Sequence, residues 1–349
     1  MAGGIGSRFW PMSTSEKPKQ FLDILGVGRT LIQHTYDRFA DICPKENVYV
    51  VTNEAYKDLI IEQLQINPAQ VIAEPLRRNT APCIAYASFK IAQINPEANL
   101  IVAPSDHLIL DQPGFENIVE LALNQAMEED CLITLGIKPS RPDTGYGYIQ
   151  FMDANKGENG LIKKVKTFTE KPDLKLANKF LASGDFYWNG GIFVWTARSI
   201  MNALESLLPE VYTLFNKGVG KYNTSEELDF IADTYERCKN ISIDYGVMEK
   251  AENVYVVLSD FGWSDLGTWG SLYDSLPKQE DGNAVVGERV FMYDSNNCIV
   301  NMPEDKLVIL QGLDDYIVVE SNKTLLVCKK SDEQKIREMV NEVNGHGKQ

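Results

Sequence analysis

Histidine is the scarcest chemically versatile residue in this chain of 349 residues, which has only three, at positions 34, 107 and 346. A zinc site built from several histidines is therefore disfavoured. The six cysteines, at positions 43, 83, 131, 238, 298 and 328, include no Cys-x-x-Cys pair. Scattered cysteines in a chain of this length are typical of reduced, mostly buried side chains in a reducing compartment.

Long hydrophobic runs and an excess of basic residues are missing as well. No stretch of about 18 apolar residues is present, so the sequence predicts no membrane-spanning helix. Because no apolar leader with a small-residue cleavage site opens the chain, we expect a cytoplasmic protein. The net charge of −15 argues against a nucleic-acid partner, because phosphate backbones bind to basic surfaces. Small phosphorylated ligands remain compatible where basic residues converge locally.

The first half of the chain alternates β-like and helix-like segments. Apolar strand patterns cover residues 47–52, 70–75, 99–107 and 131–139, and helical patterns cover residues 53–65, 80–93 and 115–129. This alternation predicts an α/β fold with a mostly parallel central sheet, whose ligands lie beyond the carboxyl ends of the strands. From about residue 283 the chain becomes a run of short strands separated by Asn, Asp and Gly. We therefore expect a catalytic domain over 1–280 and a small β-rich domain with a terminal helix over 281–349.

The opening "AGGIGSRFW" has the composition of an anion-binding turn. Clustered glycines let backbone N–H groups approach a phosphate, and Arg8 adds a guanidinium suited to phosphate oxygens. Lys17 and Lys19 follow in "KPKQF". The glycines alone are equally typical of a surface turn, and "GGIGSR" matches neither the P-loop nor the Gly-x-Gly-x-x-Gly pattern. Arg8 and the two lysines favour the phosphate interpretation.

Two aspartates are candidate metal ligands. Asp106 follows a strand in "APSDH", and Asp265 lies in "GWSDLGTW". Mg²⁺ prefers one or two carboxylates together with phosphate oxygens and water, which this pair would supply. Asp106 alone is also typical of a turn or helix cap. We expect His107, next to it, to be a packing or orienting neighbour rather than a base.

These motifs, taken in order, resemble the sugar-nucleotide pyrophosphorylases, and "GSRFWPMS" with "KPKQF" resembles the mannose-1-phosphate guanylyltransferase branch in particular. The likeness covers residues 2 to about 275 and includes "EPLRRNTAP", "APSDH", "DTGYGYI", "FTEKP", "WNGGIFVW" and "WSDLGTW". Long bifunctional members carry a C-terminal isomerase domain, which we do not expect in this chain.

The resemblance implies a Rossmann-like nucleotide-diphospho-sugar transferase fold, Mg²⁺ as cofactor, and transfer of GMP from GTP to mannose-1-phosphate. It implies catalytic roles for Arg8, Lys19, Asp106 and Asp265, with the two aspartates on the metal. It implies nucleotide contacts at Gly3, Gly4, Gly6, Ser7, Arg78, Asn79, Thr80 and Ser105. It implies sugar-phosphate contacts at Gly147, Glu170, Lys171 and Asn189. A homodimer formed through the β-rich domain is expected as well.

The chemistry of this reaction suits the residue types independently. A phosphate monoester has a second pKa of about 6, so the attacking oxygen is already anionic and no general base is required. The reaction needs positioning and positive charge instead. Three alternatives stay open: another hexose- or heptose-1-phosphate or another nucleotide, a non-catalytic sugar-nucleotide-binding homologue, and a Rossmann dehydrogenase. The last would leave "PKQF" and "WSDLGTW" unexplained.

The turn at Gly3 raises one further expectation. Phosphate-binding turns in α/β folds follow a strand, yet only Met1 and Ala2 precede Gly3. That strand would be central in the sheet, and each of its apolar side chains would contribute about 1.5–3 kcal/mol when buried. We therefore expect that a strand is missing before Met1.

Overall fold

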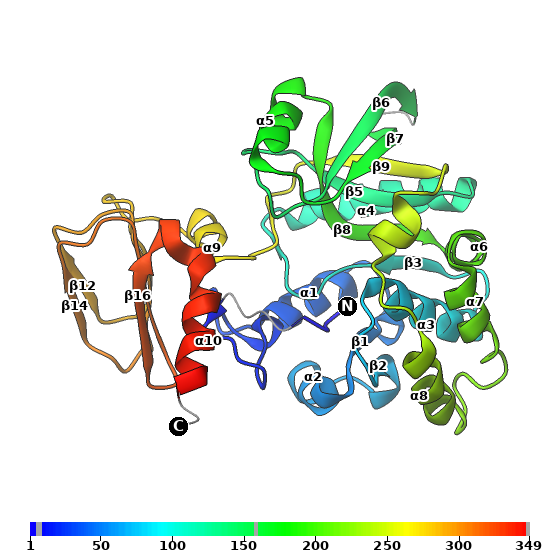
Figure 1. Cartoon of the computed structure of the whole chain (residues 1–349), viewed down its shortest axis with the longest axis horizontal. Coiled ribbons are helices and arrows are strands. Elements are labelled where there is room, and N and C mark those ends of the chain that lie inside the picture. Colours follow the sequence, from blue (N-terminus) through cyan, green and yellow to red (C-terminus); the bar gives the residue numbers. More distant parts are fainter. Residues whose placement is uncertain (5–8, 157–159, 347–349) are drawn as a thin grey trace. The chain divides into compact units, whose positions relative to one another are not determined.

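The computed structural model describes residues 1–4, 9–156 and 160–346, which Figure 1 colours from blue at the N-terminus to red at the C-terminus. Packing divides the chain into two units, each assembled from segments far apart in the sequence. Unit 1 contains Met1 with residues 42–104 and 109–263, and unit 2 contains residues 2–41, 105–108 and 264–349. The chain passes from one unit to the other after residues 1, 41, 104, 108 and 263. The last two of these points lie in the short strands β4 (Leu108–Ile109) and β10 (Trp263–Ser264). The expected domain boundary after residue 280 stays a prediction.

Six of the described strands in unit 1 form one mixed sheet in the order β3-β8-β5-β9-β7-β6. Their bounds are β3 (Asn99–Val102), β5 (Leu132–Ile137), β6 (Tyr148–Lys156), β7 (Ile162–Thr169), β8 (Phe186–Thr196) and β9 (Val254–Ser259). β5 and β9 are parallel, β8 is antiparallel to β3, β5 and β6, and β7 is antiparallel to β6 and β9. β3, β5, β6 and β9 therefore run in one direction and β7 and β8 in the other. The predicted α/β fold is confirmed, but among the described pairings of this sheet only that of β5 with β9 is parallel, so the central sheet is mixed rather than mostly parallel.

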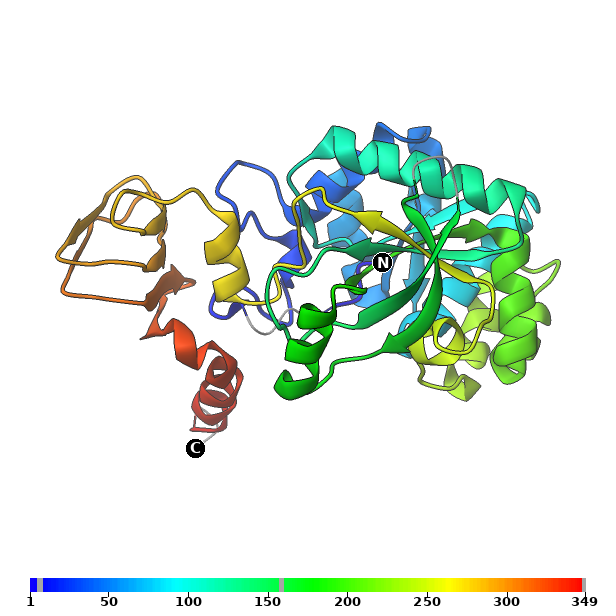
Figure 2. The ribbon, with the colours of Figure 1, turned by 90° about the horizontal axis from the view of Figure 1, so that it is seen from above.

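Helices cover this sheet. α4 (Gln112–Glu128) packs against β3, β5, β8 and β9, and α6 (Ala197–Leu207) packs against β8 and α3 (Thr80–Ala92). Figure 2 shows the twist of the sheet between these helices. Every residue of β5 is buried, as expected for a continuous apolar strand covered on both faces. The other helices of unit 1 are α2 (Lys57–Leu64), α5 (Leu174–Ser183), α7 (Pro209–Asn216) and α8 (Glu227–Arg237).

Two further strands of unit 1 form a separate sheet. β1 (Val50–Asn53) pairs in parallel with β2 (Val71–Glu74), and α3 then leads the chain from β2 to β3. Within the described parts of the chain, β1 pairs with β2 alone and β3 with β8 alone, so each sheet has an open edge. The Met1 ammonium donates to Ala103 O over 2.7 Å, directly after the end of β3.

A buried ion pair joins α3 to α8. Lys90 Nζ lies 2.5 Å from Glu227 Oε2, and Glu227 Oε1 also accepts a hydrogen bond of 2.6 Å from the Tyr86 hydroxyl. The Asn223 N–H donates to Oε2 over 2.6 Å. Burial raises the pKa of Glu227, but the hydrogen bonds from Lys90, Tyr86 and Asn223 outweigh burial and hold that pKa below its ordinary value. The ion pair and these hydrogen bonds therefore offset the cost of burying the charged Glu227 carboxylate.

Replacing Lys90 by methionine is expected to lower the free energy of unfolding by about 3–5 kcal/mol at pH 7, because Glu227 would remain buried and charged without its cation. In the wild type the folded pKa of Glu227 lies below the unfolded one, so this stabilisation is present above the unfolded pKa and is lost as the pH falls through the folded pKa. Urea unfolding at pH 7 and pH 4 measures both effects. In the variant the lone carboxylate can take up a proton at pH 4, so the cost should shrink there.

The control for that variant is Lys175→Met, which removes an exposed lysine from α5. It should leave the free energy of unfolding within about 0.5 kcal/mol of the wild type, as for ordinary surface substitutions. A Lys90→Met cost that equals this control, or that does not change between pH 7 and pH 4, would contradict the prediction.

Unit 2 combines the first 40 residues with the C-terminal β-rich region. β13 (Ile299–Asn301) pairs in parallel with β11 (Ala284–Val286) and β15 (Tyr316–Ser321), and β12 (Val290–Tyr293) pairs in parallel with β14 (Val308–Gln311). β16 (Thr324–Lys329) is antiparallel to β15. Phe9, Leu22 and Leu31, from the start of the chain, share a core with Trp269 and Ile317. The helices are α1 (Leu31–Ala40), α9 (Trp269–Ser275) and α10 (Ile336–His346).

The expectations about cysteines and membrane segments can be compared with the structure. The six cysteines are free, and all but Cys43 are buried, as predicted. Across residues 1–4, 9–156 and 160–346, no helix is both long and apolar enough to cross a membrane.

Candidate active site

The Lys19 ammonium joins the two segments that carry the candidate metal ligands, all within unit 2. Lys19 opens a short 3₁₀ turn, Lys19–Phe21, and is only 5% exposed. Its Nζ lies 2.9 Å from Asp106 Oδ2, 2.7 Å from Asp265 O and 3.1 Å from Leu266 O. These three acceptors match the three N–H donors of an ammonium group. Lys19 thus holds Asp106 beside the 265–266 turn.

The electrostatics around Asp106 favour its charged form. Burial raises the pKa of Asp106, but the charge and hydrogen bond of Lys19, together with His107, bring that pKa below its ordinary value. Burial lowers the pKa of His107 to about 4, against the opposing effect of Asp106 and Asp265. The imidazole is therefore neutral near pH 7, as suits an orienting neighbour. Ser105, a predicted nucleotide contact, is buried beside them.

The turn after Asp265 explains the local sequence "SDLG". Leu266 has φ +44°, a left-handed conformation that is rare for a bulky residue, and its side chain is fully buried. The Gly267 N–H donates to Asp265 Oδ1 over 2.9 Å, and a Cβ at Gly267 would lie 2.5 Å from Asp265 Oδ2. A side chain at position 267 would therefore displace this carboxylate. The strain is of the kind that accumulates at functional sites.

The donor set fits a magnesium ion bound mainly by its substrate. Asp106 and Asp265 supply hard carboxylate oxygens, and both belong to residues that contact Lys19 Nζ. In the part of the chain that the structure describes, no three His, Cys, Asp or Glu side chains gather into a cage for a metal ion. A divalent ion here would take its remaining ligands from phosphate and water.

The start of the glycine-rich segment, residues 2–4, is held by a residue that sequence reasoning missed. Gln20 is 1% exposed, and its Nε2 donates to Ala2 O over 2.9 Å and to Gly4 O over 3.1 Å. No described atom lies within 4 Å of a Cβ built on Gly4. Gly3 lies between these two contacts, whereas the predicted contacts Gly6, Ser7 and Arg8 lie outside the described residues.

Three of the four predicted sugar-phosphate residues come together in unit 1. A Cβ at Gly147 would lie 2.5 Å from Glu170 Oε2 and 3.4 Å from Asn189 Cβ, so these residues are in direct contact. The Asn189 N–H donates to Gly147 O over 2.8 Å. Lys171, the fourth, has a positive φ of 48° and an exposed side chain that reaches Glu170 Oε1 at 3.0 Å. Spacing of the motifs along the chain gave no indication of this contact geometry.

An aromatic cluster adjoins this group. The Tyr146 ring is edge-on to Trp188 at 4.9 Å and to Trp263 at 5.3 Å between centroids. The Arg141 guanidinium lies 5.4 Å from the Trp188 ring. Trp195 and Trp269 are fully buried, whereas Trp263 is partly exposed.

The predicted nucleotide loop at residues 78–80 is bonded to the last turn of α8 and to the chain that follows it. Arg78 donates through Nε to Tyr235 O over 2.9 Å and through Nη2 to Glu236 O over 3.2 Å. Its guanidinium is thus partly engaged in holding the loop. Asn79 has φ +69° and accepts from the Thr80 N–H, and Thr80 Oγ1 accepts from the Ile243 N–H over 2.8 Å.

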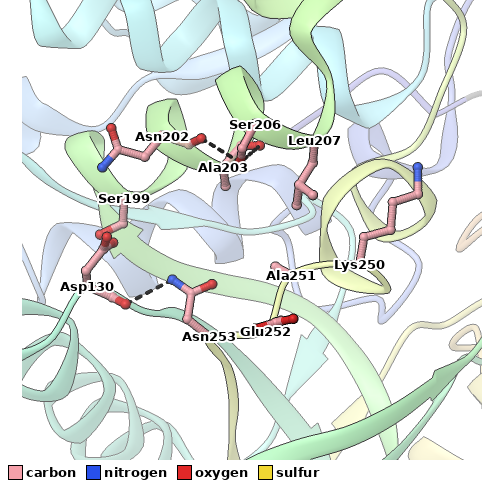
Figure 3. A pocket seen from close by; sticks show the side chains of 10 residues that line it. All are labelled: Asp130, Ser199, Asn202, Ala203, Ser206, Leu207, Lys250, Ala251, Glu252 and Asn253. Atoms are coloured by element: carbon pink, nitrogen blue, oxygen red, sulfur yellow. Dashed lines mark hydrogen bonds between the residues drawn. The ribbon is translucent and has the colours of Figure 1, made fainter.

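A polar cavity of about 330 Å³ lies elsewhere in unit 1 (Figure 3). Asp130 and Asn253, in its wall, precede the first residues of β5 and β9, at the amino ends of these parallel strands. Ligands of such sheets bind at the carboxyl ends instead. Several polar groups of the cavity are already paired, for example Asn253 Nδ2 with Asp130 O at 2.9 Å. The cavity is therefore not the candidate active site.

Comparison with known proteins shows the family of this chain. The nucleotidyl transferase family model matches residues 1–282, and the model of the MannoseP isomerase/GMP-like beta-helix domain matches residues 288–343. The chain belongs to the nucleotidyl transferase family. This nucleotidyl transferase is 36% identical over 344 residues to the mannose-1-phosphate guanylyltransferase of Klebsiella pneumoniae, covering 97% of this chain and 72% of that protein.

Two further proteins are similar to this nucleotidyl transferase over almost its whole length. The alginate biosynthesis protein AlgA of Pseudomonas aeruginosa is 36% identical, over 100% of this chain and 72% of its own length. A crystal structure from Thermus thermophilus, described as a mannose-1-phosphate geranyltransferase, superposes with a TM-score of 0.88 at 30% identity. It covers 99% of this chain and 98% of that one. The fold expected from the sequence resemblance is confirmed.

Proposed function

We propose that this nucleotidyl transferase forms GDP-mannose and pyrophosphate from GTP and mannose-1-phosphate. The observation that carries the proposal is the 36% identity, along 97% of the chain, to proteins named for this activity. An oxygen of the sugar phosphate attacks the α-phosphorus of GTP. The bond from that phosphorus to the β-phosphate bridging oxygen breaks, and pyrophosphate carries away the electron pair.

The residues of unit 2 suit the triphosphate. Asp106 and Asp265 would hold Mg²⁺, which supplies positive charge against the phosphate oxygens when bound. The glycine-rich segment would offer backbone N–H groups, and Gln20 holds Ala2 and Gly4 at its start. Lys19 serves this site by placing Asp106 and the 265–266 turn, because its three donors are occupied.

The residues of unit 1 suit the sugar phosphate. Glu170 and Asn189 present a carboxylate and an amide side by side, which together accept from and donate to hydroxyl groups. The exposed Lys171 ammonium is available to a phosphate. No base is required, and His107 has a pKa of about 4 beside two carboxylates, in keeping with a role other than proton transfer from the nucleophile.

Pyrophosphate release tests the proposal. The chain is assayed with Mg²⁺ and each of GTP, ATP, UTP and dTTP, paired in turn with mannose-, glucose- and galactose-1-phosphate. We expect turnover with GTP and mannose-1-phosphate at least tenfold above every other pair. Preference for another pair would keep the mechanism and replace the substrates. Binding of GDP-mannose without turnover of any pair would favour the non-catalytic homologue.

A further inference from the structure

The Asn189 amide is almost fully paired within the protein. Its Oδ1 accepts from Thr134 Oγ1 and from the Gly191 N–H, each over 3.1 Å, which uses both lone pairs of the oxygen. Its Nδ2 donates one hydrogen to Asp244 Oδ1 over 2.8 Å. No acceptor among the described residues takes the second N–H of Asn189, which leaves it for a ligand, and its direction is set by these three partners.

Asp244 is the partner that decides where the nitrogen lies. A carboxylate only accepts and a main-chain N–H only donates, so Asp244 and the Gly191 N–H select the same orientation of the amide. The Thr134 hydroxyl can do either and selects neither. Without Asp244, one of the two groups that distinguish the amide nitrogen from the oxygen is lost.

The position of Asp244 is itself fixed by the chain around it. Asp244 is the first residue of the short π-helix Asp244–Met248. Immediately before it, the Ile243 N–H donates to Thr80 Oγ1 over 2.8 Å and the Ile241 N–H donates to Arg78 O over 3.3 Å. Asp244 is therefore anchored to the 78–80 loop on one side and to Asn189 on the other.

The groups around Asp244 include hydrogen-bond acceptors and a donor, which would suit the hydroxyl groups of a polyol. Burial and the neighbouring Glu170 carboxylate raise the pKa of Asp244, and the Asn189 hydrogen bond opposes them. Two carboxylates thus lie near one free amide N–H, which offers acceptors and a donor at short range. A ring hydroxyl both donates and accepts, so it fits such a group better than a phosphate does.

We propose that Asp244 is a positioning residue for sugar recognition: it orients the Asn189 amide so that its free N–H meets a hydroxyl of the sugar ring. The inference rests on the proposed function, because it assigns a sugar to this group. It goes beyond the motif residues Gly147, Glu170, Lys171 and Asn189, since Asp244 acts through Asn189.

Calorimetric binding of GDP-mannose and of GTP, with the wild type and Asp244→Asn, tests the inference. We expect GDP-mannose to bind about tenfold or more weakly to the variant, because an asparagine at 244 can donate as well as accept and so no longer selects one orientation of the Asn189 amide. GTP should bind within about twofold of the wild type. In turnover, KM for mannose-1-phosphate should rise while KM for GTP does not. Unchanged GDP-mannose affinity, or an equal loss for both ligands, would overturn the inference.

Two further variants keep the test decisive. Glu249→Gln removes an exposed neighbouring carboxylate and should leave both affinities unchanged. Thr134→Val removes another partner of Asn189 and should weaken GDP-mannose binding in the same direction, with less than additive loss when combined with Asp244→Asn. If Asp244→Asn does not fold, Thr134→Val alone is decisive, and a GDP-mannose affinity unchanged in that variant overturns the inference. A wild type that does not bind GDP-mannose at all would instead contradict the proposed function.

Discussion

Asp265→Asn is expected to reduce kcat by about 10²–10³-fold or more, because it removes one of the two carboxylates assigned to Mg²⁺ and so weakens the charge stabilisation of the leaving pyrophosphate. The fold around it should survive. Lys19 bonds to the main-chain oxygens of residues 265 and 266, and an asparagine Oδ1 can still accept from the Gly267 N–H. We therefore expect a large loss of activity with an unchanged melting temperature.

Asp106→Asn should behave differently, which makes the pair informative. Asp106 forms the ion pair with Lys19, so the variant leaves a buried ammonium without its carboxylate. Activity and melting temperature should both fall. In the wild type the folded pKa of Asp106 lies below the unfolded one, so this contribution to stability is lost as the pH falls through the folded pKa.

Steady-state kinetics at saturating Mg²⁺ and thermal unfolding of the same samples measure both variants. Asp260→Asn is the matched control, because it neutralises an exposed aspartate five residues before Asp265. It should retain kcat and melting temperature. Asp265→Asn with kcat within threefold of the wild type would remove Asp265 from the proposed metal site.

An apolar strand added before Met1 is expected to stabilise the protein by a few kcal/mol, since each buried valine or isoleucine contributes about 1.5–3 kcal/mol, against about 1–2 kcal/mol per residue for ordering the backbone. Residues placed before Met1 would run beside β3 with their carboxyl end at the carboxyl end of β3, because the Met1 nitrogen contacts Ala103 O. The added strand would therefore be parallel to β3.

The neighbouring strands indicate why such a segment would fit. β3 and β1 each have an open edge among the described strands, and Met1 packs against the same core as Val51 and Val102. The Met1 ammonium also acts on Glu74 at the end of β2, where burial raises the carboxyl pKa to about 7 and the Tyr235 hydrogen bond and the ammonium lower it. The two strands with open edges, β1 and β3, thus both contribute to the core against which Met1 packs.

Chemical denaturation of chains carrying five added residues tests this expectation. One extension alternates valine and isoleucine, and the matched control of equal length contains glycine, serine and asparagine. Hydrogen exchange of the β3 amides should slow with the apolar extension only. Equal stability of the two extended chains would show that the space beside β3 does not accept a strand.

The sequence alone determined the elements and the family. A continuous apolar run predicted β5 because a strand covered on both faces favours apolar residues along its length, and the order of the motifs carried the resemblance. Gly147, Glu170 and Asn189 were named from those motifs, and the structure places them in contact. Their assignment to the sugar phosphate stays a prediction.

Tertiary structure alone decided which groups meet. Asp244 lies 55 residues from Asn189, and Lys19 lies more than 240 residues from Asp265, so neither contact leaves a periodic trace in the sequence. In the sequence Gln20 is only a polar neighbour of Lys19. In the structure its amide donates to the main-chain oxygens of Ala2 and Gly4. Hydrogen bonds depend on angstrom-scale distances, which are fixed only when the sheet and its loops are packed. Burial, in contrast, follows the local pattern of apolar residues along each strand and helix.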